Sequence, residues 1–164
     1  MDKITGAINY QYQVLRYRHD AVSGEFVNIG IVFFDAENRF LQAWITEKQE
    51  RIVRFFGSAS RAFLLGTTKH IEAEFNQIAK RLATDKTVYY ASITEITSAV
   101  LPINDNGLFF SEIHKGWHFD HQNVFNDTYY RLIGKYNGEQ AEENASLSVS
   151  KHWEEPLLVT VWHQ

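Results

Sequence analysis

The sequence contains no cysteine and only two prolines, and it has no long run of hydrophobic residues. Without cysteine the chain can form no disulfide framework, no cysteine-ligated zinc or iron–sulfur cluster, and no cysteine nucleophile. The longest apolar stretch, residues 29–34, is far too short to span a bilayer, and the first residues lack the apolar core of a secretory signal. We therefore expect a cytoplasmic protein that does not enter a membrane.

Familiar catalytic and phosphate-binding motifs are also missing. The chain has no GxGxxG, no GxxxxGK[ST] and no GxSxG sequence, so dinucleotide-binding, P-loop and α/β-hydrolase functions lose their sequence support. A formal net charge of −4 gives no long-range attraction to nucleic acid. We expect no cofactor and no nucleic-acid partner, and we favour a non-enzymatic protein.

What the sequence does contain is a large supply of core residues. The 164 residues are 45% hydrophobic and 15% aromatic. A chain of this length fits one domain and buries roughly 70% of its extended surface without staples. The aromatic excess is typical of a packed core, and it is also compatible with an interaction surface.

The first third of the chain predicts a β-meander. Residues 8–17 alternate, residues 26–34 are apolar on both faces, and residues 39–45 follow a short polar turn. The middle segment is therefore expected to be a central strand. Gly30 within it indicates a bulge or a close approach of another backbone.

Helical periodicity appears in the remainder. Thr46 and Gln49 have the spacing of a capping box, and a longer helix is predicted over residues 60–83. The apolar stripe of this helix comprises Leu64, Thr68, Ile71, Phe75, Ile78 and Leu82. A strand is predicted over residues 108–114, then a turn at Lys115–Gly116. Asp120 is expected to cap a helix whose stripe comprises Phe125, Tyr129, Leu132 and Tyr136.

These elements predict an α+β fold, in which an antiparallel meander sheet of about four or five strands packs helices on one face. Residues 1–136 are expected to form a single domain. Residues 137–164 are expected to be a polar linker followed by a short strand, residues 156–162. A strand at the end of such a linker needs a sheet edge to pair with, either in its own chain or in a partner.

The densest polar feature is the first hairpin, which carries the predicted binding residues Arg16, Arg18, Glu25 and Asn28. The two arginines share a strand face and could hold a phosphate or carboxylate. Alternatively, Arg16 pairs with Glu25 across the hairpin and the cluster is only structural. We expect these two side chains to face each other.

Three histidines, His114, His118 and His121, follow one another closely. Histidine is a common metal ligand, but the predicted turn at Gly116 leaves no helix to align the three rings. We therefore expect no metal site here.

The runs Tyr12–Tyr17, His19–Asp20 and Gly24–Phe34, with Arg39–Leu41 and Gly107–Phe110, resemble the bacterial family catalogued as domain of unknown function 3037. The resemblance covers about residues 8–136. It implies no activity and assigns no role to the motif residues. Genes of such proteins often neighbour kinases of the HipA-like class, which implies a bacterial partner or regulatory protein.

Two functions follow as expectations. The first is a non-enzymatic protein-interaction or regulatory module, with a HipA-like kinase as candidate partner and homo-oligomerisation as a further form of association. The alternative is an enzyme or ligand-binding domain that holds a phosphorylated small molecule or nucleic acid through Arg16, Arg18, Glu25 and Asn28.

Overall fold

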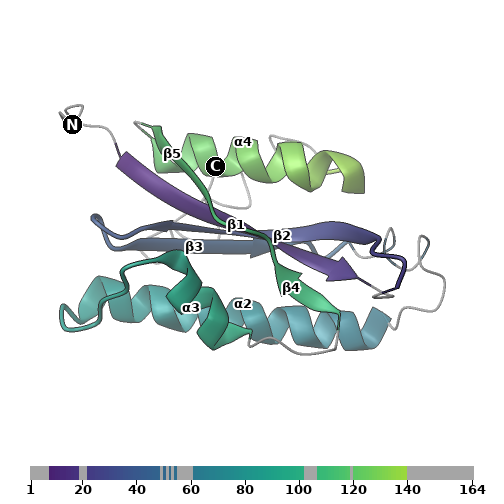
Figure 1. The fold of residues 1–164 in the computed structure, drawn as a ribbon, viewed down its shortest axis with the longest axis horizontal. Helices are drawn as coiled ribbons and strands as arrows, with labels where there is room; N and C mark the ends of the chain where they lie inside the picture. The colour runs from purple at the N-terminus through teal and green to yellow at the C-terminus, as the bar shows by residue number, and fades with distance from the viewer. Residues whose placement is uncertain are drawn as a thin grey trace.

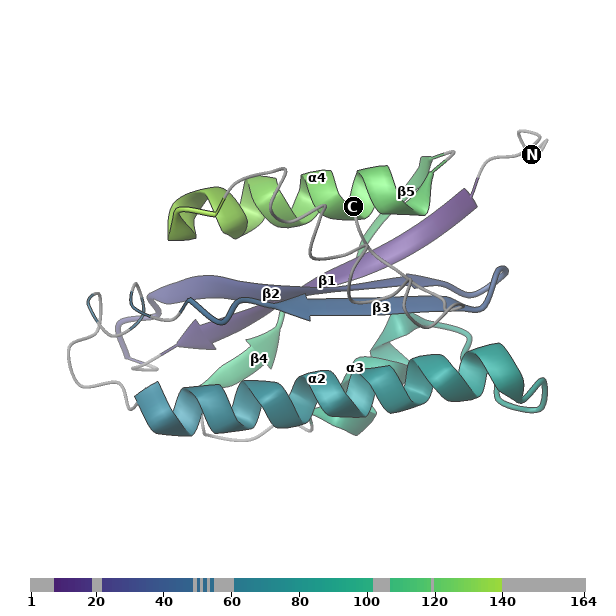
Figure 2. The same ribbon diagram turned by 180° about the vertical axis from the view of Figure 1, so that it is seen from behind.

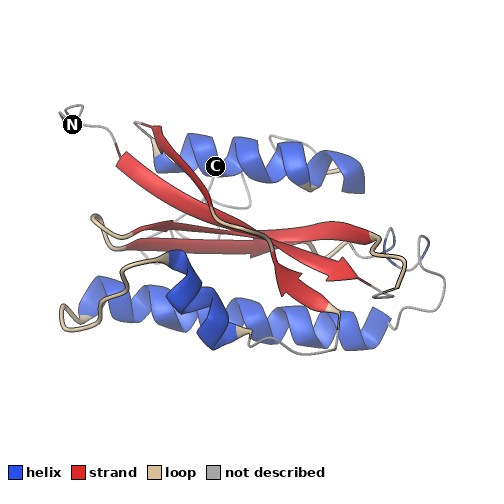
Figure 3. Ribbon diagram, viewed as in Figure 1, coloured by secondary structure: helices blue, strands red, loops and turns tan. Residues whose placement is uncertain are grey.

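The computed structural model describes residues 8–18, 22–48, 50, 52, 54, 61–101, 107–118 and 120–139. They form a five-stranded antiparallel sheet between helical layers (Figures 1 and 3). The elements in chain order are β1 (Ile8–Arg18), β2 (Phe26–Asp35), β3 (Phe40–Ile45), α2 (Arg61–Thr84), α3 (Ile93–Val100), β4 (Leu108–Phe110), β5 (His114–His118), α4 (His121–Leu132) and the 3₁₀ helix η1 (Gly134–Asn137). The predicted α+β fold with an antiparallel meander sheet is confirmed. No described helix is long and apolar enough to cross a membrane.

Strand β1 is an interior strand of the sheet, and two short strands pair with the edge of β1 that faces away from β2. β2 pairs along one side of β1, and β3 pairs with β2. On the other side, β4 lies opposite Leu15–Tyr17 and β5 lies opposite Ile8–Tyr12. Ser111 joins the two short strands: its N–H donates to the Val14 carbonyl, and its hydroxyl accepts the Val14 N–H. The predicted single strand at 108–114 is therefore two strands with a hydrogen-bonded serine near their junction.

The predicted turn at Lys115–Gly116 is wrong, because both residues lie within β5. Gly116 is opposite Tyr10 in the ladder. A Cβ atom at Gly116 would come within 2.6 Å of Cζ of the Tyr10 ring. The glycine therefore gives space to a tyrosine ring across the sheet instead of reversing the chain.

Gly30 occupies a bulge in β2, and both parts of its prediction are confirmed. Leu15 pairs with Gly30 and Arg16 with Asn28, so Ile29 has no partner on β1. A Cβ at Gly30 would lie 2.9 Å from Cγ1 of Ile45 and 3.0 Å from the Trp44 carbonyl oxygen. The absent side chain allows β3 to approach closely beside the bulge.

The helices cover both faces of the sheet, so the prediction of helices on one face is wrong in that detail. α2 and α3 lie on one side and α4 on the other (Figure 2). Val32 and Phe34 of β2 belong to the core beneath α2, whereas Ile31 and Phe33 belong to the core beneath α4. A strand that is apolar on both faces needs a covering layer on each.

The predicted helical stripes place the helices correctly. The six stripe residues of α2 are all buried: Leu64, Thr68, Ile71, Phe75, Ile78 and Leu82. Asp120 caps α4, since its side chain accepts the N–H groups of Gln122 and Asn123. Phe125 and Tyr129 of α4 are buried against the sheet. Tyr136 lies in η1 and is exposed.

The packed part of the chain continues to Glu139, whose carboxylate is buried against Tyr129 and Thr46. The predicted division between residues 1–136 and 137–164 stays a prediction. The predicted strand at 156–162 lies outside the described residues.

Candidate functional site

Three of the four predicted binding residues gather on the face of the sheet that α4 covers in part. Leu15 and Tyr17 belong to the core beneath α2, so Arg16 and Arg18 point to the opposite face, because side chains alternate along a strand. Asn28 lies opposite Arg16 on β2, and its side-chain amide donates to the Leu132 carbonyl at the end of α4. The cluster therefore lies beside the C-terminal end of α4.

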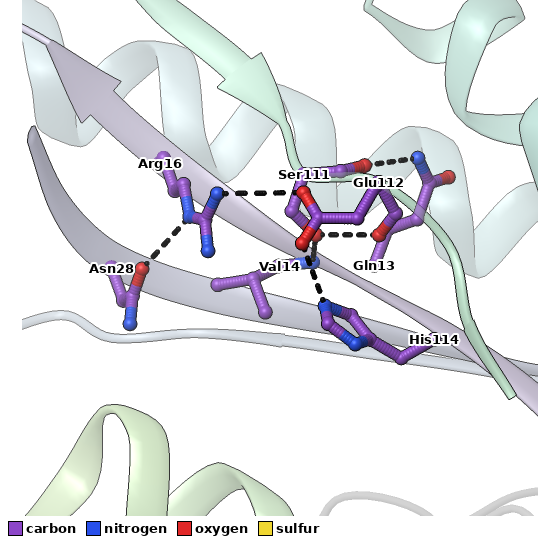
Figure 4. A network of polar contacts seen from close by, with 7 residues as sticks. All are labelled: Gln13, Val14, Arg16, Asn28, Ser111, Glu112 and His114. Atoms are coloured by element: carbon purple, nitrogen blue, oxygen red, sulfur yellow. Dashed lines mark hydrogen bonds and ion pairs between the residues drawn. The ribbon is translucent and has the colours of Figure 1, made fainter. Parts of the chain in front are cut away.

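Arg16 is held in place by three neighbours. Its Nε donates to Oδ1 of Asn28 at 3.1 Å, and its guanidinium lies 4.5 Å from the centre of the Phe26 ring. Its Nη1 lies 3.9 Å from the Glu112 carboxylate (Figure 4). The last contact contributes little, because Glu112 is 71% exposed. Arg16 is fixed mainly by Asn28 and Phe26.

Arg18 has a different environment. Its guanidinium lies 4.6 Å from the centre of the Phe109 ring, and Phe109 meets Phe26 edge to face at 6.0 Å. Phe26 is 43% exposed. We call Arg16, Arg18, Phe26, Asn28 and Phe109 the arginine–aromatic patch. Across the described residues, the Arg18 guanidinium has no carboxylate partner.

The predicted pairing of Arg16 with Glu25 is wrong. The register of β1 and β2 puts Asn28 opposite Arg16 and Phe26 opposite Arg18. Glu25 precedes β2 and is exposed in the turn, where its N–H donates to the Ser23 hydroxyl. The bulge and the length of the turn set this register, and neither was fixed by composition.

Next to the patch, Glu112 connects Arg16 with His114. Nε2 of His114 lies 3.4 Å from the Glu112 carboxylate (Figure 4). The His114 ring also stacks on the ring of Tyr12. The pKa of Glu112 is lowered, first by its own main-chain N–H and then by Arg16 and His114. The Glu112 carboxylate therefore lies between the Arg16 guanidinium and the His114 ring.

The three clustered histidines have separate roles. Nδ1 of His118 accepts a hydrogen bond from the Asp120 N–H. His121, the first residue of α4, contacts Asp35 at the end of β2. No described group of three histidine, aspartate or glutamate side chains is arranged to hold a metal ion. The three rings do not share one site.

Asp35 and His121 form a second polar cluster, between β2 and α4. Nε2 of His121 donates to Oδ2 of Asp35 at 2.9 Å, and the His121 ring stacks on Phe40 with centroids 4.2 Å apart. Burial raises the pKa of Asp35, but hydrogen bonds from His121 and Asn38 outweigh it and lower the pKa below its ordinary value. The carboxylate is thus ionised and fixes the His121 ring.

A third cluster closes the end of the described chain. The buried Glu139 carboxylate accepts hydrogen bonds from the Tyr129 hydroxyl at 3.1 Å and the Thr46 hydroxyl at 3.2 Å. Burial raises the pKa of Glu139 despite these bonds, and burial together with Glu139 raises the pKa of Tyr129. These hydrogen bonds join Tyr129 of α4 and Thr46, the residue after β3, to Glu139, two residues after η1.

Sequence reasoning missed the aromatic half of the patch, Phe26 and Phe109. Phe26 had a local signal, because it begins the strand that returns from the first turn. Phe109 had none, because its place beside Arg18 depends on pairing between β1 and β4.

One known family matches most of the chain. The family described as "Protein of unknown function (DUF3037)" matches residues 12–133. The chain belongs to this family. The DUF3037 match includes all five residues of the arginine–aromatic patch and ends at the C-terminal boundary of α4. No curated protein and no solved structure gives a significant match.

Proposed function

We propose that this protein is a non-enzymatic protein-interaction or regulatory module that binds its partner through the arginine–aromatic patch. The observation that supports the proposal is the Arg18 guanidinium, which is held over Phe109 without a carboxylate partner among the described residues. A guanidinium carries five N–H donors in a planar fork that matches a carboxylate or phosphate. Arg18 therefore offers directional donors on a rigid strand.

The aromatic neighbours make the same surface suitable for a protein partner. Arginine and large aromatic residues are enriched among the side chains that dominate binding energy at interfaces. The exposed Phe26 supplies apolar area, and Asn28 fixes Arg16 next to it. Because Asn28 and Phe26 already hold the Arg16 side chain, less of its conformational entropy remains to be lost on binding.

The patch fits a partner segment that presents a carboxylate beside an apolar side chain. Arg18 would pair with the carboxylate, and the ring of Phe26 would contact the apolar group. The family resemblance suggests a HipA-like kinase as the first partner to test.

The test is a binding comparison with the full chain immobilised. We expect Arg18→Ala to weaken binding of the partner at least about tenfold, the usual scale for a central interface residue. The matched control is Arg81→Ala, because Arg81 is an exposed arginine on α2, on the other face of the sheet. Thermal melting checks that both variants fold. Equal binding by Arg18→Ala, Arg81→Ala and the parent contradicts the proposal.

A second candidate function rests on the same guanidinium. A phosphate accepts bidentate donors from arginine as readily as a carboxylate does, so a phosphorylated small molecule or a nucleic-acid phosphate also fits Arg18. Calorimetric titration of the full chain with a nucleoside monophosphate and with a short single-stranded oligonucleotide tests this alternative. Binding that is lost in Arg18→Ala and kept in Arg81→Ala supports it; no heat with either ligand rejects it.

A further inference from the structure

Strand β5 is a short edge strand of the sheet with exposed side chains. Among the described residues it pairs with β1 alone, so its other edge has no partner strand there. Lys115 is exposed, and Trp117 is 54% exposed. Gly116 between them has no side chain and is still not fully buried, so main-chain atoms in the middle of the strand reach solvent. β5 therefore offers hydrogen-bonding groups and a large aromatic side chain at one accessible edge.

The two exposed side chains of β5 lie on the same face of the sheet. Lys115 is opposite Gln11 and Trp117 is opposite Asn9, and the Gln11 side chain accepts a hydrogen bond from the first N–H of α3. Because side chains alternate along a strand, Lys115 and Trp117 share the face on which α3 lies. They flank Gly116 symmetrically, with a cation on one side and an aromatic ring on the other.

This symmetry suits a second copy of the same strand. We propose that β5 pairs antiparallel with β5 of a second copy about a twofold axis at Gly116, which joins the two sheets into one. Lys115 of each copy then lies opposite Trp117 of the other, so the same contact occurs twice. The Cβ atoms of directly opposite residues are about 4.5–5.5 Å apart, which brings the ammonium within reach of the indole ring for a cation–π contact. Complementary side chains therefore identify the occupant of this edge as a second copy.

The neighbouring twofold registers are less favourable. An axis at Lys115 places two lysines opposite each other, and like charges directly opposite are destabilising. An axis at Trp117 pairs only residues 116–118 of each β5, whereas the axis at Gly116 pairs all five residues of the strand. The register centred on Gly116 therefore combines the longest ladder with opposite side chains that attract.

The proposed dimer does not depend on the arginine–aromatic patch, because β5 carries none of the residues of that patch. Five paired residues from each copy form a small interface, so the dimer should dissociate on dilution. Sedimentation of the full chain from about 10 μM to about 1 mM should show a monomer that converts to a dimer. A chain that remains monomeric throughout this range overturns the proposal.

A residue swap tests the pairing. Trp117→Lys places a lysine opposite Lys115 on both sides of the axis, so we expect the dissociation constant of the dimer to rise by about tenfold or more. The double variant Lys115→Trp/Trp117→Lys restores one cation and one ring in each pair and should regain the parent's dissociation constant. The matched control is Tyr136→Lys, because Tyr136 is a similarly exposed aromatic residue in η1, beyond the other end of α4. Thermal melting checks that the variants fold. Unchanged association of Trp117→Lys, or no recovery in the double variant, overturns the proposal.

Disulfide formation gives an independent readout, because the chain has no cysteine of its own. An equimolar mixture of Lys115→Cys and Trp117→Cys chains should form a cross-linked heterodimer under mild oxidation, since opposite residues of a ladder have the Cα separation that a disulfide requires. Each heterodimer also keeps one unaltered Lys115–Trp117 pair. Either variant alone should not cross-link, because its two cysteines lie diagonally, roughly 7–8 Å apart. Equal cross-linking in a single variant, or none in the mixture, overturns the proposal.

Discussion

At the scale of single residues, Gly30 shows how a missing side chain shapes the sheet. Its bulge lets Ile29 remain in the core beneath α2 while Ile31 enters the core beneath α4. Because the bulge changes the alternation of β2, it also brings Asn28 to the same face as Arg16. The geometry of the arginine–aromatic patch therefore depends on one glycine.

We expect Gly30→Ala to destabilise the protein by about 1–3 kcal/mol, the usual cost of overpacking. The new Cβ would lie 3.0 Å from the Trp44 carbonyl, and a main-chain atom in a paired strand cannot move away cheaply. Gly66→Ala is the matched control, because Gly66 lies within α2 and a Cβ added there would meet no atom within 4 Å; it should stabilise the helix by roughly 0.5–1 kcal/mol. Urea denaturation measures both changes, and equal effects would contradict the packing argument.

At the scale of elements, much of the structure could be predicted from local patterns. The meander strands and the stripe of α2 were predicted because alternation and helical periodicity are local properties of the chain. The two short strands β4 and β5 could not be separated, because only their pairing with β1 distinguishes them. The predicted binding cluster was correct only in part for the same reason. Arg16, Arg18 and Asn28 lie on one face of the sheet, but the position of Glu25 depends on the pairing of β1 with β2, which the sequence did not reveal. Because β2 is apolar on both faces, its sequence indicates that a helical layer packs on each face of the sheet. The sequence does not indicate which helix packs on which face.

Arg39 joins the end of α2 to the start of β3. Its guanidinium donates to three main-chain carbonyls, those of Leu82, Asp85 and Val88, at 2.7–2.8 Å. Helices end with carbonyl groups that lack partners, and a cation there also interacts favourably with the helix dipole. Arg39 therefore supplies a cap from outside the helix.

We expect Arg39→Ala to lower the free energy of unfolding by about 2 kcal/mol, within the range for hydrogen bonds from a charged donor. Arg39→Lys should recover only part of this loss, because an ammonium cannot reproduce the planar fork. Lys80→Ala is the control: Lys80 is an exposed cation near the same helix end, and its removal should change stability by less than about 0.5 kcal/mol. Chemical denaturation of the three variants measures these differences. A fully stable Arg39→Ala variant would show that the cap is dispensable.

At the scale of the whole molecule, Glu139 makes stability depend on pH. Its pKa is raised above the ordinary value of 4.5, chiefly by burial. A raised folded-state pKa means that folding favours the protonated carboxyl. The corresponding stability is present below the unfolded-state pKa and is lost as the pH rises through the folded-state pKa.

We therefore expect Glu139→Gln to remove this component of the pH dependence. The glutamine stays neutral and still accepts a hydrogen bond from Tyr129 or Thr46. Relative to this variant, the parent should lose stability as the pH rises from about 4.5 toward neutrality. The exposed Glu25 provides the control, and Glu25→Gln should follow the parent curve. Parallel curves for the parent and Glu139→Gln, measured by urea denaturation across this range, would contradict the prediction.

The position of β1 inside the sheet has a consequence for synthesis on the ribosome. Val14 is hydrogen-bonded to Ser111, 97 residues later in the chain, and α4 begins only at His121. During translation, the first three strands therefore emerge before the elements that cover the two apolar faces of β2 have been made. Contacts between residues this far apart in sequence form late and slowly, and uncovered strands are prone to self-association. The nascent chain should accordingly need shielding by a chaperone until α4 has left the ribosomal tunnel.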